Sequence, residues 1–354
     1  MRLRPWLSVL ALLFVTGVAG AETPLWDDNN VPPAVQAKLN KGQDLAMDKQ
    51  FTEAEAMIRE AMQEIPEHPV GWLFLIATEL GRIQEGFKAA KSKVPDDFFK
   101  DADHLVDMGQ AQLKLYPKSA DTRVYLGAAF GIRGLAKLYA GSYLASYRDG
   151  KRGAAYLKEA VTIDDKTYNA YMGLGQFEYY CGTLSGVLQF VLALPGSPDK
   201  GLDMLKTCEE KGTYAAWPCR SYRVKLQIAD RKDFKNSADG LVALVERYPH
   251  NDEHALGVFE ALKADVNTPA LRRSAETVLS RLDQGWSPPA YSQLQPHQAR
   301  LTLAKAYLMA GDPKSARKHL EHFRSMGPSP IRAEAMALLE PMASLAPTSG
   351  TAKP

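Results

Sequence analysis

The feature that most constrains this chain is a spacing of small and apolar residues that occurs twice, once near each end. The first copy lies within 36–66 and the second within 304–328. In both copies the key residues have offsets of 0, 3, 12, 16, 19 and 24. They are Gly42, Leu45, Ala54, Ile58, Ala61 and Pro66, then Ala304, Tyr307, Ala316, Leu320, Phe323 and Pro328. This spacing predicts two short antiparallel helices with a small residue at their crossing and a proline that ends the unit.

The spacing resembles that of the tetratricopeptide repeat (TPR) family, whose unit is a helix pair of about 34 residues. The resemblance implies an all-α fold, a TPR-like α/α superhelical solenoid of about six or seven helix pairs. The first helix of each pair would line a concave face. The positions that match the family's structural residues are Gly42, Ala54, Ala61, Pro66, Gly127, Gly175, Ala304, Ala316 and Pro328.

Helix breakers and composition divide the chain into six segments. They are a signal peptide (1–21), a linker (22–32), TPR-like repeats with insertions (33–284), a second linker (285–293), a last repeat with a capping helix (294–345) and a tail predicted to be disordered (346–354). In a solenoid each unit contacts only its neighbours, so a chain of this length needs no single large core.

The N-terminus has the pattern of an export signal. Arg2 and Arg4 precede a short apolar run, and the small residues Ala19, Gly20 and Ala21 follow it. This pattern predicts cleavage after residue 21 and an exported, periplasmic protein; a retained N-terminal anchor is the alternative. Removing 1–21 leaves 41 basic and 41 acidic residues, since the segment holds two of the 43 basic residues and no acidic one. A formal net charge of zero gives no indication of a nucleic-acid partner.

Three cysteines follow the signal: Cys181, Cys208 and Cys219. The second and third lie at the end of one predicted helix and the start of the next, and export permits a disulfide between them. The alternative interpretation is that all three are buried as small apolar residues. The sequence holds no cysteine pair with zinc spacing, and we expect neither a metal nor a cofactor.

The resemblance also implies which residues face the groove. The matching positions in the fourth unit include Asn169, Gln176, Tyr179 and Tyr180. The surrounding segment is rich in tyrosine, a side chain that offers contact area together with a hydroxyl group. The alternative is that these rings fill the gaps between helices.

Two glutamates occupy slots where the repeat usually has a large apolar residue. These are Glu79 in the second unit and Glu178 in the fourth. A buried carboxylate needs a partner or a raised pKa, and Arg133 in the intervening unit is the expected partner. The set can be a buried ion pair, a polar binding site, or the acid/base pair of a glycan-cleaving enzyme.

The segment 183–196 does not match the repeat. Its apolar residues recur at i, i+3, i+4, i+7 and i+8, which predicts an inserted apolar helix. Such a helix is either buried against the repeats or exposed for peripheral contact with a membrane or a partner.

These observations predict a non-catalytic, exported scaffold that binds a protein or peptide partner in its concave groove. One alternative is an accessory protein of envelope assembly or transport that docks to an outer-membrane component through 183–196. The other alternative is an α/α-superhelical enzyme acting on cell-wall glycan.

Overall fold

The computed structural model describes residues 30–90, 93–183 and 196–343, and most of them are helical. The first half contains α1 (Pro33–Met47), α2 (Phe51–Glu64), α3 (Pro69–Lys88), α4 (Asp96–Leu115), α5 (Ala120–Tyr139), α6 (Tyr143–Ile163), α7 (Ala170–Thr183) and α9 (Pro198–Lys211). The second half contains α10 (Ala216–Ala229), α11 (Phe234–Arg247), α12 (Asp252–Lys263), α13 (Pro269–Asp283), α14 (Pro296–Met309), α15 (Pro313–Glu321), η2 (His322–Ser325) and α16 (Pro330–Ala343).

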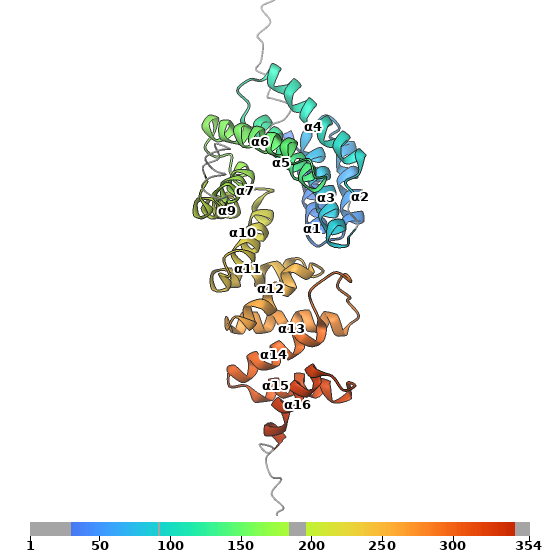
Figure 1. Cartoon of the computed structure of the whole chain (residues 1–354). Coiled ribbons are helices and arrows are strands. Elements are labelled where there is room, and N and C mark those ends of the chain that lie inside the picture. The colour runs from blue at the N-terminus through green and yellow to red at the C-terminus, as the bar shows by residue number, and fades with distance from the viewer. Residues whose placement is uncertain (1–29, 91–92, 184–195, 344–354) are drawn as a thin grey trace, which may run out of the picture.

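The helices form seven consecutive pairs, from α1 with α2 to α14 with α15, and α16 covers the last pair (Figure 1). First helices of neighbouring pairs also pack on one another, as α1 does on α3, α3 on α5 and α5 on α7. The described residues contain no strand. The prediction of an all-α, TPR-like α/α solenoid is therefore confirmed. The predicted inserted helix lies outside the described residues, except for its two end positions.

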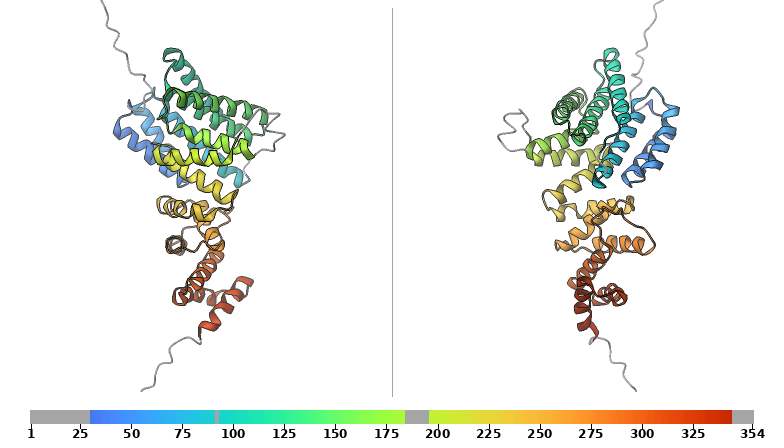
Figure 2. Two further views of the ribbon diagram at one scale, coloured as in Figure 1. Left: turned by 90° about the vertical axis from the view of Figure 1, so that its left-hand side faces the viewer. Right: turned by 45° about the vertical axis from the view of Figure 1, so that its right-hand side comes forward.

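Figures 1 and 2 show how the pairs are arranged in space. The first five pairs, α1 to α11, form an arch, and α12 to α16 extend away from it as a stack. The buried apolar side chains follow this division. One cluster joins α1 to α5, a second joins α10 to α14, and a third lies under α16.

Local sequence explains where the helices begin. Several helices have a polar N-cap side chain that accepts a hydrogen bond from a free backbone N–H of the first turn, as such residues commonly do. Among these N-cap residues are Ser119, Asp233, Asn251, Thr268 and Asp312. Several helices also carry proline in the first turn, where its missing N–H is not needed.

Small residues allow the paired helices to approach closely. A Cβ atom added at Gly127 of α5 would lie 2.5 Å from the Leu157 side chain on α6. One added at Gly175 of α7 would lie 2.8 Å from the backbone oxygen of Gly201 on α9. In the last repeat, Ala304 and Ala316 are both fully buried. The repeat spacing thus places small residues where helices cross.

The turn inside most pairs contains one residue with a left-handed backbone. These residues have φ between 55° and 76°. They are Lys49, Ala90, Gly141, Lys232, Asp265 and Gly311. Only glycine adopts this conformation without steric strain, so the four other residues are held there by the packing of the flanking helices.

The chain also makes a contact that a simple stack of units does not have. The end of α1 packs against the end of α11 and the turn before α12, about 200 positions away. Asp44 pairs with Arg247 at 2.7 Å, and the Asn251 side chain donates a hydrogen bond to the Met47 backbone oxygen at 2.7 Å. The expectation that each unit contacts only its neighbours is wrong here, because the arch returns to its first pair.

Candidate binding surface

Three tyrosines from three consecutive first helices approach one another. They are Tyr139 at the end of α5, Tyr180 on α7 and Tyr222 on α10. The hydroxyl oxygens of Tyr180 and Tyr222 are 2.7 Å apart, and their rings meet edge to face. The Tyr139 ring packs on Phe87 of α3, with centroids 4.9 Å apart. Tyr180 is 46% exposed, so this aromatic group remains accessible.

Charged residues continue this surface beyond the tyrosines. Lys88 pairs with Glu85 on α3 and with Glu253 on α12, and Lys225 on α10 lies 3.6 Å from the same Glu253. The pKa of Lys225 is lowered, because surrounding protein disfavours its charge and Lys88 repels it. We name the set Glu85, Lys88, Tyr139, Tyr180, Tyr222 and Lys225 the inner cluster.

Lys49 lies at the centre of the contact that closes the arch. Its ammonium group binds Glu85 at 2.9 Å and Asp252 at 2.5 Å. Burial by itself would raise the pKa of Glu85, because it disfavours the charged form. Hydrogen bonds outweigh this effect and lower the pKa to about 2; they come from Lys88, Tyr291 and Lys49. Tyr291 belongs to the segment predicted as a linker at 285–293, and its hydroxyl donates to Glu85 at 2.6 Å.

A buried histidine next to this contact is held neutral. His254 on α12 accepts or donates a hydrogen bond with the Ser221 hydroxyl at 2.9 Å. Burial, with Lys49 and Lys225 nearby, lowers its pKa to about 3. An uncharged imidazole therefore lies beside the charged groups that close the arch.

The structure separates the two neighbouring tyrosines that the repeat register predicts for the groove. Tyr180 is exposed and contacts Tyr222, as described above. Tyr179 is only 1% exposed and belongs to the core between α7, α9 and α10. Its backbone and Cβ lie against Gly201 of α9. The groove prediction for Tyr179 is wrong, because its side chain is buried against α9 and α10 and is not accessible to a partner.

The other two predicted groove residues have different surroundings. Asn169 connects two turns: its side-chain oxygen accepts from the backbone N–H of Thr213 at 3.0 Å, and its amide donates to the Thr213 hydroxyl at 2.8 Å. It therefore holds the start of α7 against the start of α10. Gln176 is half-buried on α7.

Arg133 pairs with neither Glu79 nor Glu178, although the sequence predicts it as their partner. It binds Asp149 of α6 through two hydrogen bonds, at 2.8 and 2.9 Å, and also contacts Asp103 of α4. Burial raises the pKa of Asp149, but its hydrogen bonds with Arg133 and Lys137 outweigh this and lower it. The prediction of a set of Glu79, Glu178 and Arg133 is wrong, because Arg133 faces the crossing of α5 and α6.

The two glutamates lie at separate interfaces. Glu178 on α7 is 3.4 Å from Lys200 on α9. Glu79 on α3 lies 3.5 Å from Arg59 on α2, and one of its oxygens is buried without a hydrogen-bond partner. Burial, together with the negative charge of Asp101, raises the pKa of Glu79 to about 7. Each glutamate thus interacts with the helices packed beside its own.

A disulfide joins α9 to α10. It links Cys208 to Cys219, with Cα atoms 6.1 Å apart. Both residues and the third cysteine, Cys181, are buried. The bond therefore crosses an interface on which the Tyr179 side chain also packs.

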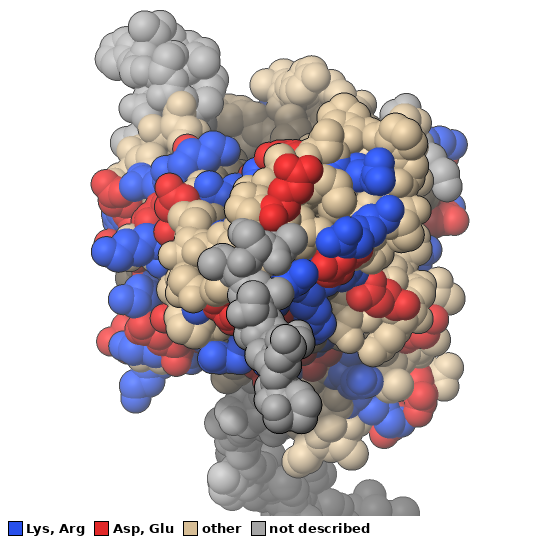
Figure 3. Space-filling view, turned by 90° about the horizontal axis from the view of Figure 1, so that it is seen from below, with Lys and Arg blue, Asp and Glu red and all other residues tan. Residues whose placement is uncertain are grey.

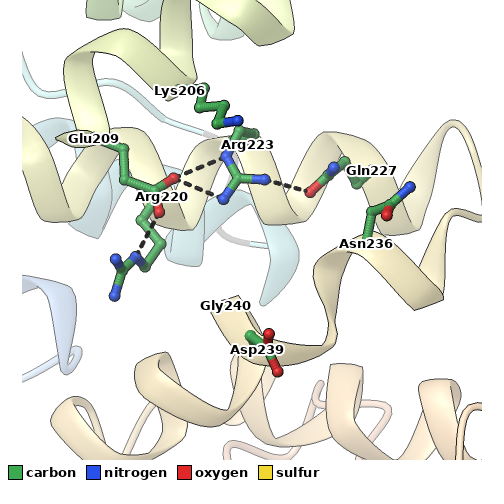
Figure 4. A pocket seen from close by; sticks show the side chains of 8 residues that line it. All are labelled: Lys206, Glu209, Arg220, Arg223, Gln227, Asn236, Asp239 and Gly240. Carbon is green, nitrogen blue, oxygen red and sulfur yellow. Dashed lines mark hydrogen bonds and ion pairs between the residues drawn. The ribbon is translucent and has the colours of Figure 1, made fainter.

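A polar hollow of about 550 Å³ lies between α9, α10 and α11 (Figure 4). Its charged groups largely satisfy one another. Arg223 binds Glu209 at 2.7 Å and Gln227 at 2.9 Å, and Arg220 binds the same glutamate at 2.8 Å. We therefore assign this hollow a structural role.

Two further properties concern the described residues as a whole. They contain no group of three histidine, cysteine or carboxylate side chains suited to hold a metal ion. None of their helices combines the length and apolar character needed to cross a bilayer. On the face seen along the stack from its C-terminal end, positive and negative side chains are interspersed (Figure 3).

Sequence signals for the inner cluster are weak. Tyr222 and Lys225 belong to the fifth unit, where the repeat register is most degenerate. Glu85 and Lys88 lie at the end of a helix that runs beyond the usual repeat length. Tyr139 belongs to a tyrosine-rich segment, but nothing in the spacing indicates that it faces inward.

The helix pairs, their crossings and the packing of first helices define this chain as a TPR-type α-solenoid. No family model and no curated protein matches the sequence. Solved structures with a similar fold include the thermophilic TPR protein TTC0263 of Thermus thermophilus, at 15% identity and a TM-score of 0.37, covering 64% of this chain and 98% of that one. Yeast Tom70 is similar at 12% identity and a TM-score of 0.23, covering 88% of this chain and 96% of that one. The human IFIT1 dimer with m7Gppp-AAAA has 12% identity and a TM-score of 0.34, covering 90% and 76%.

Proposed function

We propose that this protein is an exported, periplasmic scaffold that binds a protein or peptide partner on the inner side of its arch. The observation that supports this most is the inner cluster. Tyrosines from α5, α7 and α10 meet there, and Tyr180 is 46% exposed. Rings with a hydroxyl group bury a large area on binding and still satisfy polar atoms of a partner, which is why tyrosine is enriched at interfaces.

The closing contact supports the same proposal. Lys49, Glu85 and Asp252 connect the first pair to α12, so the two ends of the arch are held together. A surface that is already arranged before binding loses less conformational entropy when a partner arrives. Flanking charges such as Lys225 and Glu253 would then orient the partner rather than supply most of the affinity.

The experiment compares capture of the partner by two single variants. Tyr180→Ala and Tyr222→Ala, used as baits on a periplasmic extract, are expected to capture at least about tenfold less of the wild-type partner, since interface tyrosines often contribute over about 2 kcal/mol. Leu115→Ala is the matched control, because Leu115 is 71% exposed on α4 and lies outside the inner cluster. Equal capture by all three variants would contradict the proposal.

The alternatives remain testable on the same protein. Docking to an outer-membrane component through 183–196 concerns a segment outside the described residues. Glycan cleavage by Glu79 and Glu178 has less support, since each carboxylate interacts with its own neighbouring helices. Clearing on a peptidoglycan zymogram that disappears in Glu178→Gln would replace the scaffold proposal with an enzymatic one.

A further inference from the structure

The tip of the α5–α6 hairpin exposes an unusual amount of apolar surface. Leu138 is 45% exposed, Tyr143 is 71% exposed and Leu144 is 61% exposed. The described residues include seven exposed large hydrophobic side chains, and three of them lie within these seven positions. Single exposed apolar side chains are ordinary, but a group of them commonly marks an interaction site.

The hairpin that carries this tip is closely packed where its two helices cross. A Cβ atom added at Gly134 of α5 would lie 3.2 Å from the Ser146 backbone oxygen on α6, so the two backbones nearly touch. Two hydrogen bonds between Arg133 and Asp149 fix the same crossing. The apolar side chains at the tip therefore extend from a well-packed pair of helices.

Positive charge without acidic partners follows the tip along α6. Arg148, Lys151 and Arg152 are all exposed, and no carboxylate within the described part of the chain pairs with them. Lys151 lies over the Tyr147 ring and Arg152 over the Phe130 ring. Asp149, the acidic residue among them, is buried and already binds Arg133 and Lys137.

We propose that the α5–α6 tip, 138–152, docks onto an anionic phospholipid surface. Leucine and tyrosine side chains would enter the interfacial layer, where tyrosine is favoured because its ring and its hydroxyl match the two sides of the boundary. The three cations of α6 would contact the headgroup phosphates. A lipid layer fits these side chains better than a folded partner does, because it can deform around exposed side chains that project from a hairpin end.

The test measures binding to vesicles of phosphatidylcholine alone and of equal parts phosphatidylcholine and phosphatidylglycerol. Each variant is purified with the N-terminus that results from expression in the cell, so that the N-terminus is the same in every variant. Wild type is expected to sediment with the mixed vesicles, and binding should weaken as salt rises. A triple variant combines Arg148→Gln, Lys151→Gln and Arg152→Gln. It should bind the mixed vesicles roughly a hundredfold less or weaker still, since each cation near the surface contributes about 1 kcal/mol.

The apolar contribution is tested with a matched pair of variants. Tyr143→Ser combined with Leu144→Ser is expected to reduce binding by at least about tenfold, and since both residues are exposed the variant should keep its thermal unfolding midpoint. Met309→Ser is the control, because Met309 is 59% exposed at the end of α14 and should not contribute. Failure of wild type to bind the mixed vesicles, or equal binding by the double variant and the control, would overturn the proposal. Capture of an acidic protein without vesicle binding would also overturn it.

Discussion

At the scale of single residues, Glu79 shows how strongly surroundings change a common side chain. It lies on α3 with its side chain only 17% exposed. Arg59 is its nearest cation, at 3.5 Å, whereas Asp101 repels it. Its pKa of about 7 means that the folded protein binds a proton on this group at a pH where the unfolded chain does not.

We expect Glu79 to make stability fall as pH rises from about 4.5 to about 7. Below that window the carboxyl is protonated in both states and carries no penalty, and above it the folded state holds a buried charge. Glu79→Gln should therefore be more stable than wild type at pH 8, by on the order of 1–3 kcal/mol, and nearly equal to it at pH 4.5. Urea unfolding at the two pH values measures this, and a difference that does not change with pH would contradict the assignment.

At the scale of helices, a buried ion pair joins α5 to α6. The side chains of Arg133 and Asp149 are 11% and 6% exposed, and they join α5 to α6. An ion pair at this depth contributes little net stability, but removal of one partner leaves the charge of the other incompletely compensated in a buried site.

Asp149→Asn is accordingly expected to destabilise the protein by about 3 kcal/mol, because Arg133 loses its bidentate acceptor in a buried site. Glu159→Gln serves as its control. Glu159 also binds an arginine of α5, Arg123, at 2.9 Å, but its own side chain is 55% exposed. Loss of that pair should change stability by less than about 1 kcal/mol. Similar losses in the two variants, measured by denaturant unfolding, would show that burial does not set the cost.

At the scale of the whole molecule, the arch closes on itself through charged groups. Lys49 reaches Glu85 of the second pair and Asp252 of α12, and its side chain is only 13% exposed. Contacts between residues about 200 positions apart fix how strongly the superhelix curves. They also bring Lys225 and Lys88 to the same carboxylate, Glu253, and thereby complete the inner cluster.

Lys49→Met should open this contact. Glu85 and Asp252 would lose the cation that they share, and the arch would lose one of its connections to α12. We expect a larger radius of gyration in small-angle X-ray scattering and a lower unfolding midpoint. Lys38→Met is the control, because Lys38 pairs with Glu60 and Glu64 at an exposed site within the first pair. Unchanged scattering from Lys49→Met would show that other contacts close the arch.

The helix pairs were predictable from sequence, whereas the relations between distant pairs were not. Small residues such as Gly127 and Gly175 mark the points where paired helices cross. Because both helices of a crossing belong to the same repeat, local spacing was sufficient to predict the pairs. The direction in which a side chain points from its helix was not predictable: Tyr179 is buried in the core, whereas its neighbour Tyr180 is exposed. The contact of Asp44 with Arg247 depends on small rotations that accumulate over all the intervening pairs, which no local pattern records.

Site-specific photocrosslinking in intact cells can show whether the inner cluster contacts a partner. A photoreactive phenylalanine analogue replaces Tyr180 in one protein and Leu115, on the outer helix α4, in another. We expect a specific crosslinked product from position 180 that is absent or much weaker from position 115. The same products from both positions, or none from position 180, would contradict this expectation.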